Sequence, residues 1–191
     1  MNNTIPIHAF TAKYPGRVSR IITDLTVFPA FDPSLPPDKH PKGCSTKALW
    51  DTGATHSVIT QETVNNLGLV PTGKINLNHA GGSGLSNSYL VNFFLPNKVG
   101  FAGIPVSECQ SVNGNFGAII GMDIICAGDF SITNVDSKTC MTFRVPSVEL
   151  IDYVVDVKKR KFAGVVRNDP CPCGKKDSSG KPIKFKKCCG K

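Results

Sequence analysis

Apolar and polar residues alternate over much of the first 146 residues, and this pattern predicts short strands. Residues 17–31 read as one or two strands. Residues 73–96 predict two strands joined by a glycine-rich tip, and residues 131–145 predict a hairpin that turns at "VDSK". Because helical signals are few and short strands are many, the sequence favours an all-β, barrel-like domain.

Two short helices are expected within this domain. Thr60 can cap a helix that ends at Gly68. Farther along, an apolar strand breaks at Gly121 into a second short helix, which Asp123 would start as a cap or dipole partner. The later stretch "VELIDYVVDVKKRKFAG" is ambiguous between helix and strand, and it is interpreted as a linker.

Residues 48–60, "ALWDTGATHSVIT", predict a strand, a tight turn and a strand, with Asp51 between the two apolar segments. A carboxylate in such a place is costly unless it is hydrogen-bonded or paired. Gly53 allows a sharp turn in which backbone N–H groups approach the carboxylate, and Thr52 adds a hydroxyl. The tripeptide alone is equally typical of an ordinary hairpin turn that begins with Asp.

The longer pattern resembles the active-site segment of retropepsin-like aspartic proteases. "HAGGSGLSN" stands where those enzymes carry the flap, and "AIIGMDII" is similar to their apolar-apolar-Gly motif. The resemblance covers about residues 17–146 and implies a retropepsin-like acid protease β-barrel with one short helix. It implies the catalytic residues Asp51, Thr52 and Gly53, a substrate-binding flap of Ala80, Gly81, Gly82, Ser83 and Gly84, and active-site support from Ala54, Ile120 and Gly121.

In that family two carboxyls share a proton and activate water against a peptide bond. This chain has one Asp-Thr-Gly, and neither Asp123 nor Asp129 is followed by the Thr/Ser-Gly that a second loop needs. The resemblance therefore implies a homodimeric aspartic endopeptidase that acts on a peptide or protein substrate, with Asp51 at the two-fold axis and no catalytic cofactor. The alternative is a non-catalytic dimeric module that binds peptides or serves as a scaffold.

The eight cysteines divide into two sets. In a reducing compartment a clustered set points to a metal, and four thiolates can close a tetrahedral zinc site. Residues 169–190 resemble the SEC-C motif, a short zinc-binding tail of bacterial proteins, although the middle of the motif is longer here. The resemblance implies structural zinc and an adaptor for a partner protein or the ribosome. The expected ligands are Cys171, Cys173, Cys188 and Cys189, whereas Cys44, Cys109, Cys126 and Cys140 are expected to be small core residues.

The formal net charge of +8 is carried by the C-terminal end of the chain. Residues 158–191 hold 12 Lys or Arg and two acids, whereas residues 1–157 are slightly acidic. A basic tail permits contact with RNA or the ribosome, and a merely solvated tail is the alternative. No apolar run is long enough to span a bilayer and the N-terminus lacks signal-peptide order, so no membrane partner and a cytoplasmic location are expected. The expected domains are 1–148 (protease), 149–166 (linker) and 167–191 (zinc motif).

Overall fold

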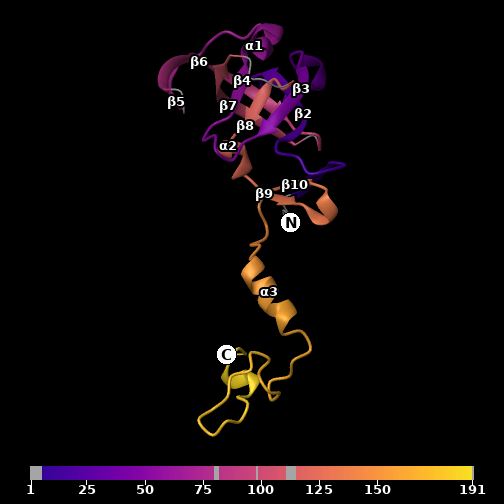
Figure 1. Ribbon diagram of the computed structural model, residues 1–191. Coiled ribbons are helices and arrows are strands. Elements are labelled where there is room, and N and C mark those ends of the chain that lie inside the picture. Colours follow the sequence, from indigo (N-terminus) through magenta and orange to yellow (C-terminus); the bar gives the residue numbers. More distant parts are fainter. Residues whose placement is uncertain (1–5, 80–81, 98, 111–114, 191) are drawn as a thin grey trace. The chain divides into compact units, whose positions relative to one another are not determined.

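The computed structural model describes residues 6–79, 82–97, 99–110 and 115–190, and the chain forms two compact units, Met1–Val148 and Glu149–Lys191 (Figure 1). Strands dominate the described part of the first unit. They are β1 (His8–Lys13), β2 (Ile21–Pro29), β3 (Cys44–Trp50), β4 (Val58–Thr60), β5 (Gly73–His79), β6 (Gly82–Phe94), β7 (Gly100–Cys109), β8 (Ala118–Ile120), β9 (Asp129–Thr133) and β10 (Cys140–Val145).

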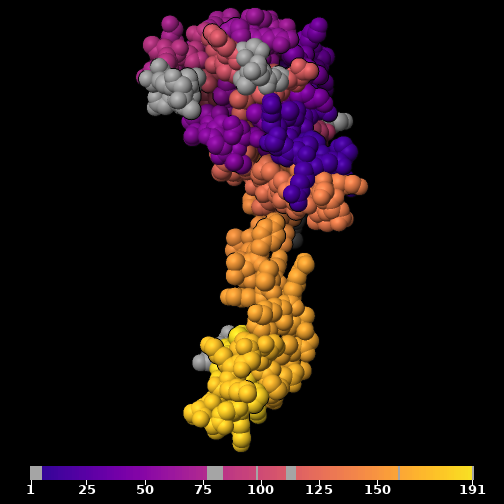
Figure 2. All heavy atoms as spheres, in the orientation of Figure 1, coloured from indigo at the N-terminus to yellow at the C-terminus, as the bar shows by residue number. Residues whose placement is uncertain are grey.

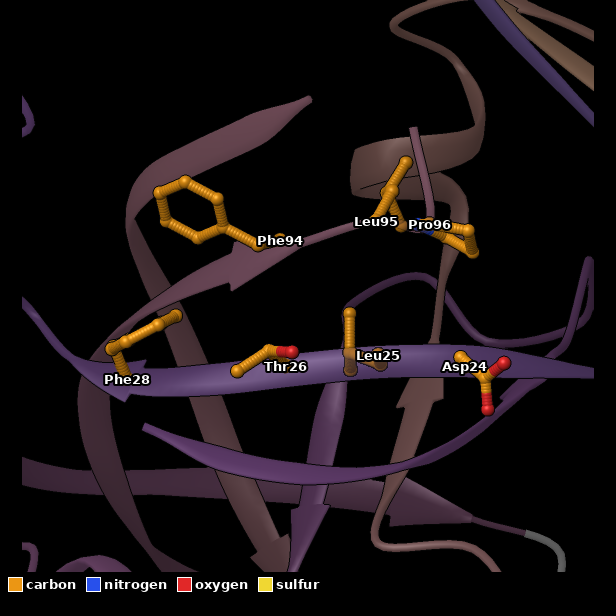
Figure 3. A pocket seen from close by; sticks show the side chains of 7 residues that line it. All are labelled: Asp24, Leu25, Thr26, Phe28, Phe94, Leu95 and Pro96. Atoms are coloured by element: carbon orange, nitrogen blue, oxygen red, sulfur yellow. The ribbon is translucent and has the colours of Figure 1, made fainter. Parts of the chain in front are cut away.

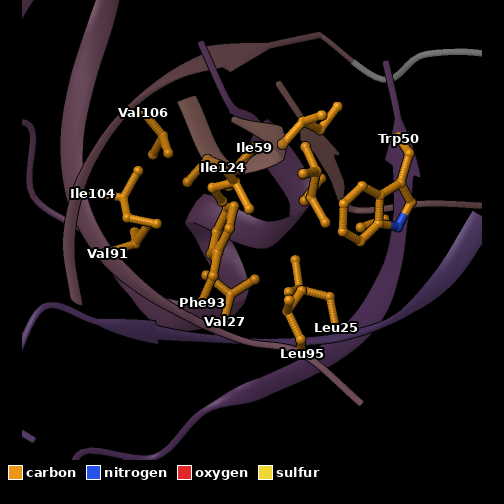
Figure 4. Packing of buried hydrophobic residues seen from close by; sticks show 14 of the residues in the cluster. Leu25, Val27, Trp50, Ile59, Val91, Phe93, Leu95, Ile104, Val106 and Ile124 are labelled. Carbon is orange, nitrogen blue, oxygen red and sulfur yellow. The ribbon is translucent and has the colours of Figure 1, made fainter. Parts of the chain in front are cut away.

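Six strands close into a barrel. They pair in the order β2-β3-β8-β4-β7-β6, and β6 pairs back onto β2, while β5 lies outside on β6. In β2 every second residue from Ile21 to Val27 is buried, which is the alternation that the sequence predicts. Val27, Val91 and Phe93 are fully buried in the core, whose packing Figure 4 shows. The predicted all-β fold class is confirmed.

The remaining strands form a separate sheet in the order β1-β10-β9. The N-terminal strand pairs antiparallel with β10, with His8 opposite Val145 and Lys13 opposite Cys140. Figure 2 shows this contact on the surface, where the indigo N-terminal segment lies against an orange segment. The predicted hairpin of residues 131–145 is confirmed as β9 and β10, joined by a 3-10 turn at Val135–Ser137.

Strands β3 and β4 flank the Asp51 segment, but they pair with β8 rather than with each other. Ala48 to Trp50 of β3 lie parallel to β8, and Val58 and Ile59 of β4 run antiparallel to it. The residues between them must therefore pass around the end of β8. The reading of this segment as an ordinary hairpin turn is wrong.

Two short helices follow these strands. Helix α1 (Gln61–Leu67) begins after Thr60, whose Oγ accepts the Thr63 N–H, and ends at Gly68 with a φ of 59°, so both predicted caps are confirmed. Helix α2 (Met122–Ile125) follows Gly121. Asp123 does not precede α2 but lies in its first turn, where its carboxylate can still accept backbone N–H groups.

The four scattered cysteines are not core residues, so this prediction is wrong. Cys44, Cys109 and Cys140 are half-buried, and Cys126 is exposed. Each lies at the end of an element: Cys44 begins β3, Cys109 ends β7, Cys140 begins β10, and Cys126 follows α2. At these positions each side chain keeps part of its surface in contact with solvent.

In the second unit the ambiguous stretch is helical over α3 (Tyr153–Lys161). The Asp152 carboxylate caps this helix by accepting the N–H groups of Val154 at 2.8 Å and Val155 at 3.2 Å. Farther along, the rings of Phe162 and Phe185 pack 5.0 Å apart, centroid to centroid. The chain also has 3-10 turns at Pro37–Lys39 and Phe185–Lys187. Within the described residues, we find no helix that combines the length and apolar character of a membrane span.

Candidate active site and candidate metal centre

Asp51 follows β3 directly and is held by backbone groups. Its N–H donates to the Ile120 carbonyl at 3.0 Å, and its own carbonyl accepts the Ala54 N–H at 3.2 Å. The Gly53 N–H donates to the Asp51 carboxylate at 2.8 Å, as the Asp-Gly spacing suggests. Asp51 is half-buried, whereas Thr52 and Gly53 are exposed. The loop thus presents a fixed and accessible carboxylate.

The loop is fastened to the start of α2 by a serine to which the sequence analysis assigned no role. Ser57 is fully buried, and its Oγ donates to the Asp123 carboxylate at 2.8 Å. The Ser57 N–H donates to the other Asp123 oxygen at 2.9 Å, and the Gly121 N–H donates to Ser57 Oγ at 3.1 Å. In the sequence Ser57 stands directly before the apolar residues Val58 and Ile59, but its partner lies 66 residues away.

The three residues expected to support the active site all contact this loop. Ile120 accepts the Asp51 N–H, and the Ala54 carbonyl accepts the Met122 N–H at 2.8 Å. A Cβ at Gly121 would lie 2.6 Å from the His56 carbonyl carbon and 2.9 Å from the Ala54 oxygen. Glycine is therefore required at 121, because two backbone segments approach each other there.

The two other acids near this region in the sequence are bound to partners of their own. Asp123 accepts bonds from Ser57 and from the Ile124 N–H. Asp129 pairs with the Arg144 Nη2 at 2.6 Å and also accepts from Ser147 and the Val148 N–H. These bonds lower the pKa of Asp129 to about 2, and the bond from the Ser147 hydroxyl has the largest effect. Neither carboxylate is left to act as a twin for Asp51.

The predicted flap lies on a β-hairpin. Strands β5 and β6 pair antiparallel, with His79 opposite Gly82 and Leu77 opposite Gly84. Gly82 and Ser83 begin β6, Gly84 is exposed, and Ala80 and Gly81 lie outside the described residues. Because the β6–β7 pairing begins at Ser88, the outer part of the hairpin extends past the barrel.

The four C-terminal cysteines come together in the second unit. Their Sγ atoms all lie within 4.8 Å of one another, with Cys173 3.4 Å and Cys189 3.9 Å from Cys188. Zinc bonded tetrahedrally to four thiolates at about 2.3 Å places the sulfurs about 3.8 Å apart, so the donor set fits. The hydrogen bond with the Cys173 thiol, burial and the other two thiols raise the pKa of Cys188 to about 12, and a bound cation would favour the thiolate instead.

A separate hollow of about 320 Å³ lies between the middle of β2 and the end of β6 (Figure 3). Phe28, Phe94 and Leu95 supply its apolar wall, and Asp24 lies at one end. The Asp24 carboxylate pairs with Lys47, and both side chains are exposed. None of the residues that line this hollow belongs to the Asp51 loop.

Comparison with known proteins finds one matching family model and several similar solved structures. Residues 41–124 match the family model "Aspartyl protease", and no curated protein sequence matches the chain. A retropepsin-like aspartic protease from Rickettsia conorii is similar at 11% identity, with 73% of this chain and 96% of that chain covered and a TM-score of 0.44. The retroviral protease-like domain of Ddi1 from Leishmania major is 19% identical over 70% and 97% of the two chains, with a TM-score of 0.40. EIAV protease, complexed with the inhibitor HBY-793, is 20% identical over 56% and 85%, with a TM-score of 0.37.

Proposed function

We propose that the chain is the subunit of a homodimeric aspartic endopeptidase whose catalytic pair consists of Asp51 from two copies. The observation that carries the proposal is the Asp51 loop itself, in which a half-buried carboxylate is fixed by the Gly53 N–H and by backbone bonds to Ile120 and Ala54. This loop lies within the residues that match the aspartyl protease model.

The second copy is needed because the chain offers one such carboxylate. Asp123 and Asp129 are engaged by Ser57 and by Arg144. A two-fold axis beside Asp51 would place an identical carboxyl opposite it without any further sequence. The scaffold alternative gives no reason to hold an acid in this manner.

The chemistry follows from the pairing. Two carboxyls about 3 Å apart cannot both ionise, so they share one proton and titrate as a unit. The ionised member takes a proton from a bound water, which attacks the peptide carbonyl carbon, while the protonated member donates to the carbonyl oxygen. The exposed Thr52 and Gly53 border the place where the peptide lies. The β5–β6 hairpin covers the peptide and limits the access of bulk water.

Replacing Asp51 with Asn tests this proposal. Asp51→Asn keeps an acceptor for the Gly53 N–H, so the fold should survive, but it removes the shared proton site. We expect cleavage of a denatured proteome to fall at least about a thousandfold, as read by mass spectrometry of new termini at pH values from about 3 to 7. The matched control is Asp24→Asn on the barrel surface, which should cleave like the wild type. A well-folded wild-type dimer that yields no new termini anywhere in this range would leave only the scaffold alternative.

For the second unit we propose a structural zinc held by Cys171, Cys173, Cys188 and Cys189. A segment this small cannot bury a sizeable core, so the metal would supply the stability that packing does not. Backbone bonds already set the ligand loops, with the Cys171 N–H donating to the Ile183 carbonyl at 2.8 Å and the Gly174 N–H to the Cys171 carbonyl at 3.1 Å. The unit would then recruit a protein partner or substrate to the peptidase.

Metal removal tests the zinc site. We expect the purified chain to contain one zinc per subunit, and a strong chelator should abolish amide protection at Cys171 and Gly174 while the barrel amides stay protected. A Cys188→Ser, Cys189→Ser variant should lack zinc from the start, and Cys126→Ser serves as the matched control because Cys126 lies outside the cluster. Unchanged protection in the metal-free protein would contradict the proposal.

A further inference from the structure

Glu108 stands out among the acids of the barrel because its carboxylate and its carbonyl both bind side chains of one neighbouring strand. Glu108 Oε1 accepts the Asn87 amide at 2.7 Å, and Glu108 Oε2 accepts the Tyr89 hydroxyl at 2.6 Å. The Glu108 carbonyl accepts the Ser86 hydroxyl at 2.9 Å. All three donors belong to β6, and Glu108 belongs to β7.

These bonds lie at the root of the β5–β6 hairpin. The paired residues of β6 and β7 begin at Ser88 opposite Ser107, so the part of β6 before Ser88 leaves the barrel. Ser86, Asn87 and Tyr89 surround that point. The clamp, meaning Glu108 with its three donors, therefore fastens the hairpin where it departs from the barrel.

The clamp is built into the barrel wall. Glu108 follows Ile104 and Val106 at two-residue intervals, and since both are buried, its side chain lies on the core-facing side of β7. Tyr89 is 2% exposed, and burial together with its bond to Glu108 raises the pKa of its hydroxyl, which keeps it a donor. Bonds to a carboxylate in such a partly buried place are among the stronger ones in proteins.

The same residue also faces the strand that leads away from the active-site loop. Glu108 lies opposite Ile59 in the parallel pairing of β7 with β4. Strand β4 begins directly after Ser57, which fastens the Asp51 loop to α2. Glu108 thus takes part in both pairings: its carboxylate binds the hairpin root, and its backbone lies beside the strand that follows the Asp51 loop.

We propose that Glu108 is a positioning residue that fixes the β5–β6 hairpin relative to the Asp51 loop. It does not touch the reacting atoms. The part of this proposal that concerns substrate rests on the proposed peptidase function. The part that concerns the hairpin rests only on the contacts of Glu108.

Replacing Glu108 with Gln tests the clamp, because the side chain keeps its size and loses one acceptor. In Glu108→Gln the new NH₂ group is a donor, and it faces another donor, either the Asn87 amide or the Tyr89 hydroxyl. One hydrogen bond is therefore lost, and the root of the hairpin opens more often. We expect amides of residues 84–88 to exchange about tenfold faster than in the wild type, while core strands such as β3 keep their rates. Peptide KM should rise about tenfold with a smaller change in kcat, because only closed hairpins hold peptide.

An exchange of partners separates positioning from a general loss of structure. In the double variant Asn87→Asp, Glu108→Gln, the amide and the carboxylate change sides, and the Gln oxygen can still accept the Tyr89 hydroxyl. Amide exchange and KM should return to near wild-type values. Tyr89→Phe, which keeps the ring in the core, should show a smaller change in the same direction as Glu108→Gln. The matched control is Glu62→Gln, which removes an exposed carboxylate from α1.

Hydrogen exchange and cleavage give independent readouts. If hairpin exchange in Glu108→Gln and Tyr89→Phe equals that of the wild type, or if the partner exchange fails to restore it, the clamp proposal is overturned. A wild-type dimer that cuts no peptide would overturn the peptidase function instead, and the exchange result would still decide the clamp.

Discussion

Gly121 shows how a single atom can decide whether the Asp51 loop forms. A Cβ at this position would lie 2.6 Å and 2.8 Å from the carbon and oxygen of the His56 carbonyl, both of them backbone atoms. Because backbone cannot rotate away as a side chain can, we expect Gly121→Ala to cost about 1–3 kcal/mol in the free energy of unfolding. Denaturant titration measures this cost, and peptide cleavage should fall with it as the Asp51 loop shifts.

The control for this prediction is another glycine with open space. At Gly73 a Cβ would meet nothing within 4 Å, so Gly73→Ala should leave the free energy of unfolding unchanged or raise it by up to about 1 kcal/mol. Equal stability of the Gly121→Ala and Gly73→Ala variants would show that the contact at residue 121 is relieved by movement of the loop.

At the residue scale, the sequence reveals the residues proposed to react more readily than the residues that hold them in place. Asp51 and Gly53 are visible because a carboxylate followed by a glycine at this spacing is a local pattern, and the bond between them is local. Ser57 and Glu108 are not visible in this way. Their partners lie 66 and about 20 residues distant, and neither a serine just before a strand nor a glutamate near the end of one carries a local mark of a distant bond.

At the scale of elements, alternation predicts most of the strands, but neither β1 nor β7. Strand β7 carries Gly103, with a φ of 64°, and Pro105, two residues that normally argue against a strand. That this segment is a strand of the barrel becomes clear only from its pairing with β6 and β4. In the same way, β3 and β4 look like the two arms of a hairpin until β8, more than 50 residues later, comes between them.

Asp129 holds the β9–β10 hairpin to the segment that leaves the barrel unit, and its protonation gives this element a pH dependence. Its pKa is lowered from 3.8 to about 2 by Ser147, Val148 and Arg144. A lowered pKa in the folded state stabilises the fold above the unfolded value, and that stabilisation is lost as the pH falls from 3.8 toward 2.

We therefore expect the unfolding midpoint of the wild type to exceed that of Asp129→Asn near pH 6, and the gap to close near pH 2. The matched control is again Asp24→Asn. Its ion pair with Lys47 is exposed, so its removal should change stability little at either pH. A gap between the wild type and Asp129→Asn that persists at the lower pH would show that Asp129 acts through packing rather than through its charge.

At the scale of the whole molecule, the proposal requires that one active site contain two chains. Mixing wild-type and Asp51→Asn subunits tests this directly, because a dimer with one intact carboxyl lacks the partner that shares its proton. If subunits exchange freely, the fraction of fully wild-type dimers varies as the square of the wild-type fraction. An equal mixture should then keep about a quarter of the activity of the same total amount of wild-type chain, whereas independent monomers would keep about half.

Size-exclusion chromatography with light scattering must show dimers throughout the titration. A linear fall in activity under those conditions would mean that each chain works alone, and Asp51 would then need its second carboxyl from within its own chain, where Asp123 and Asp129 are already bound.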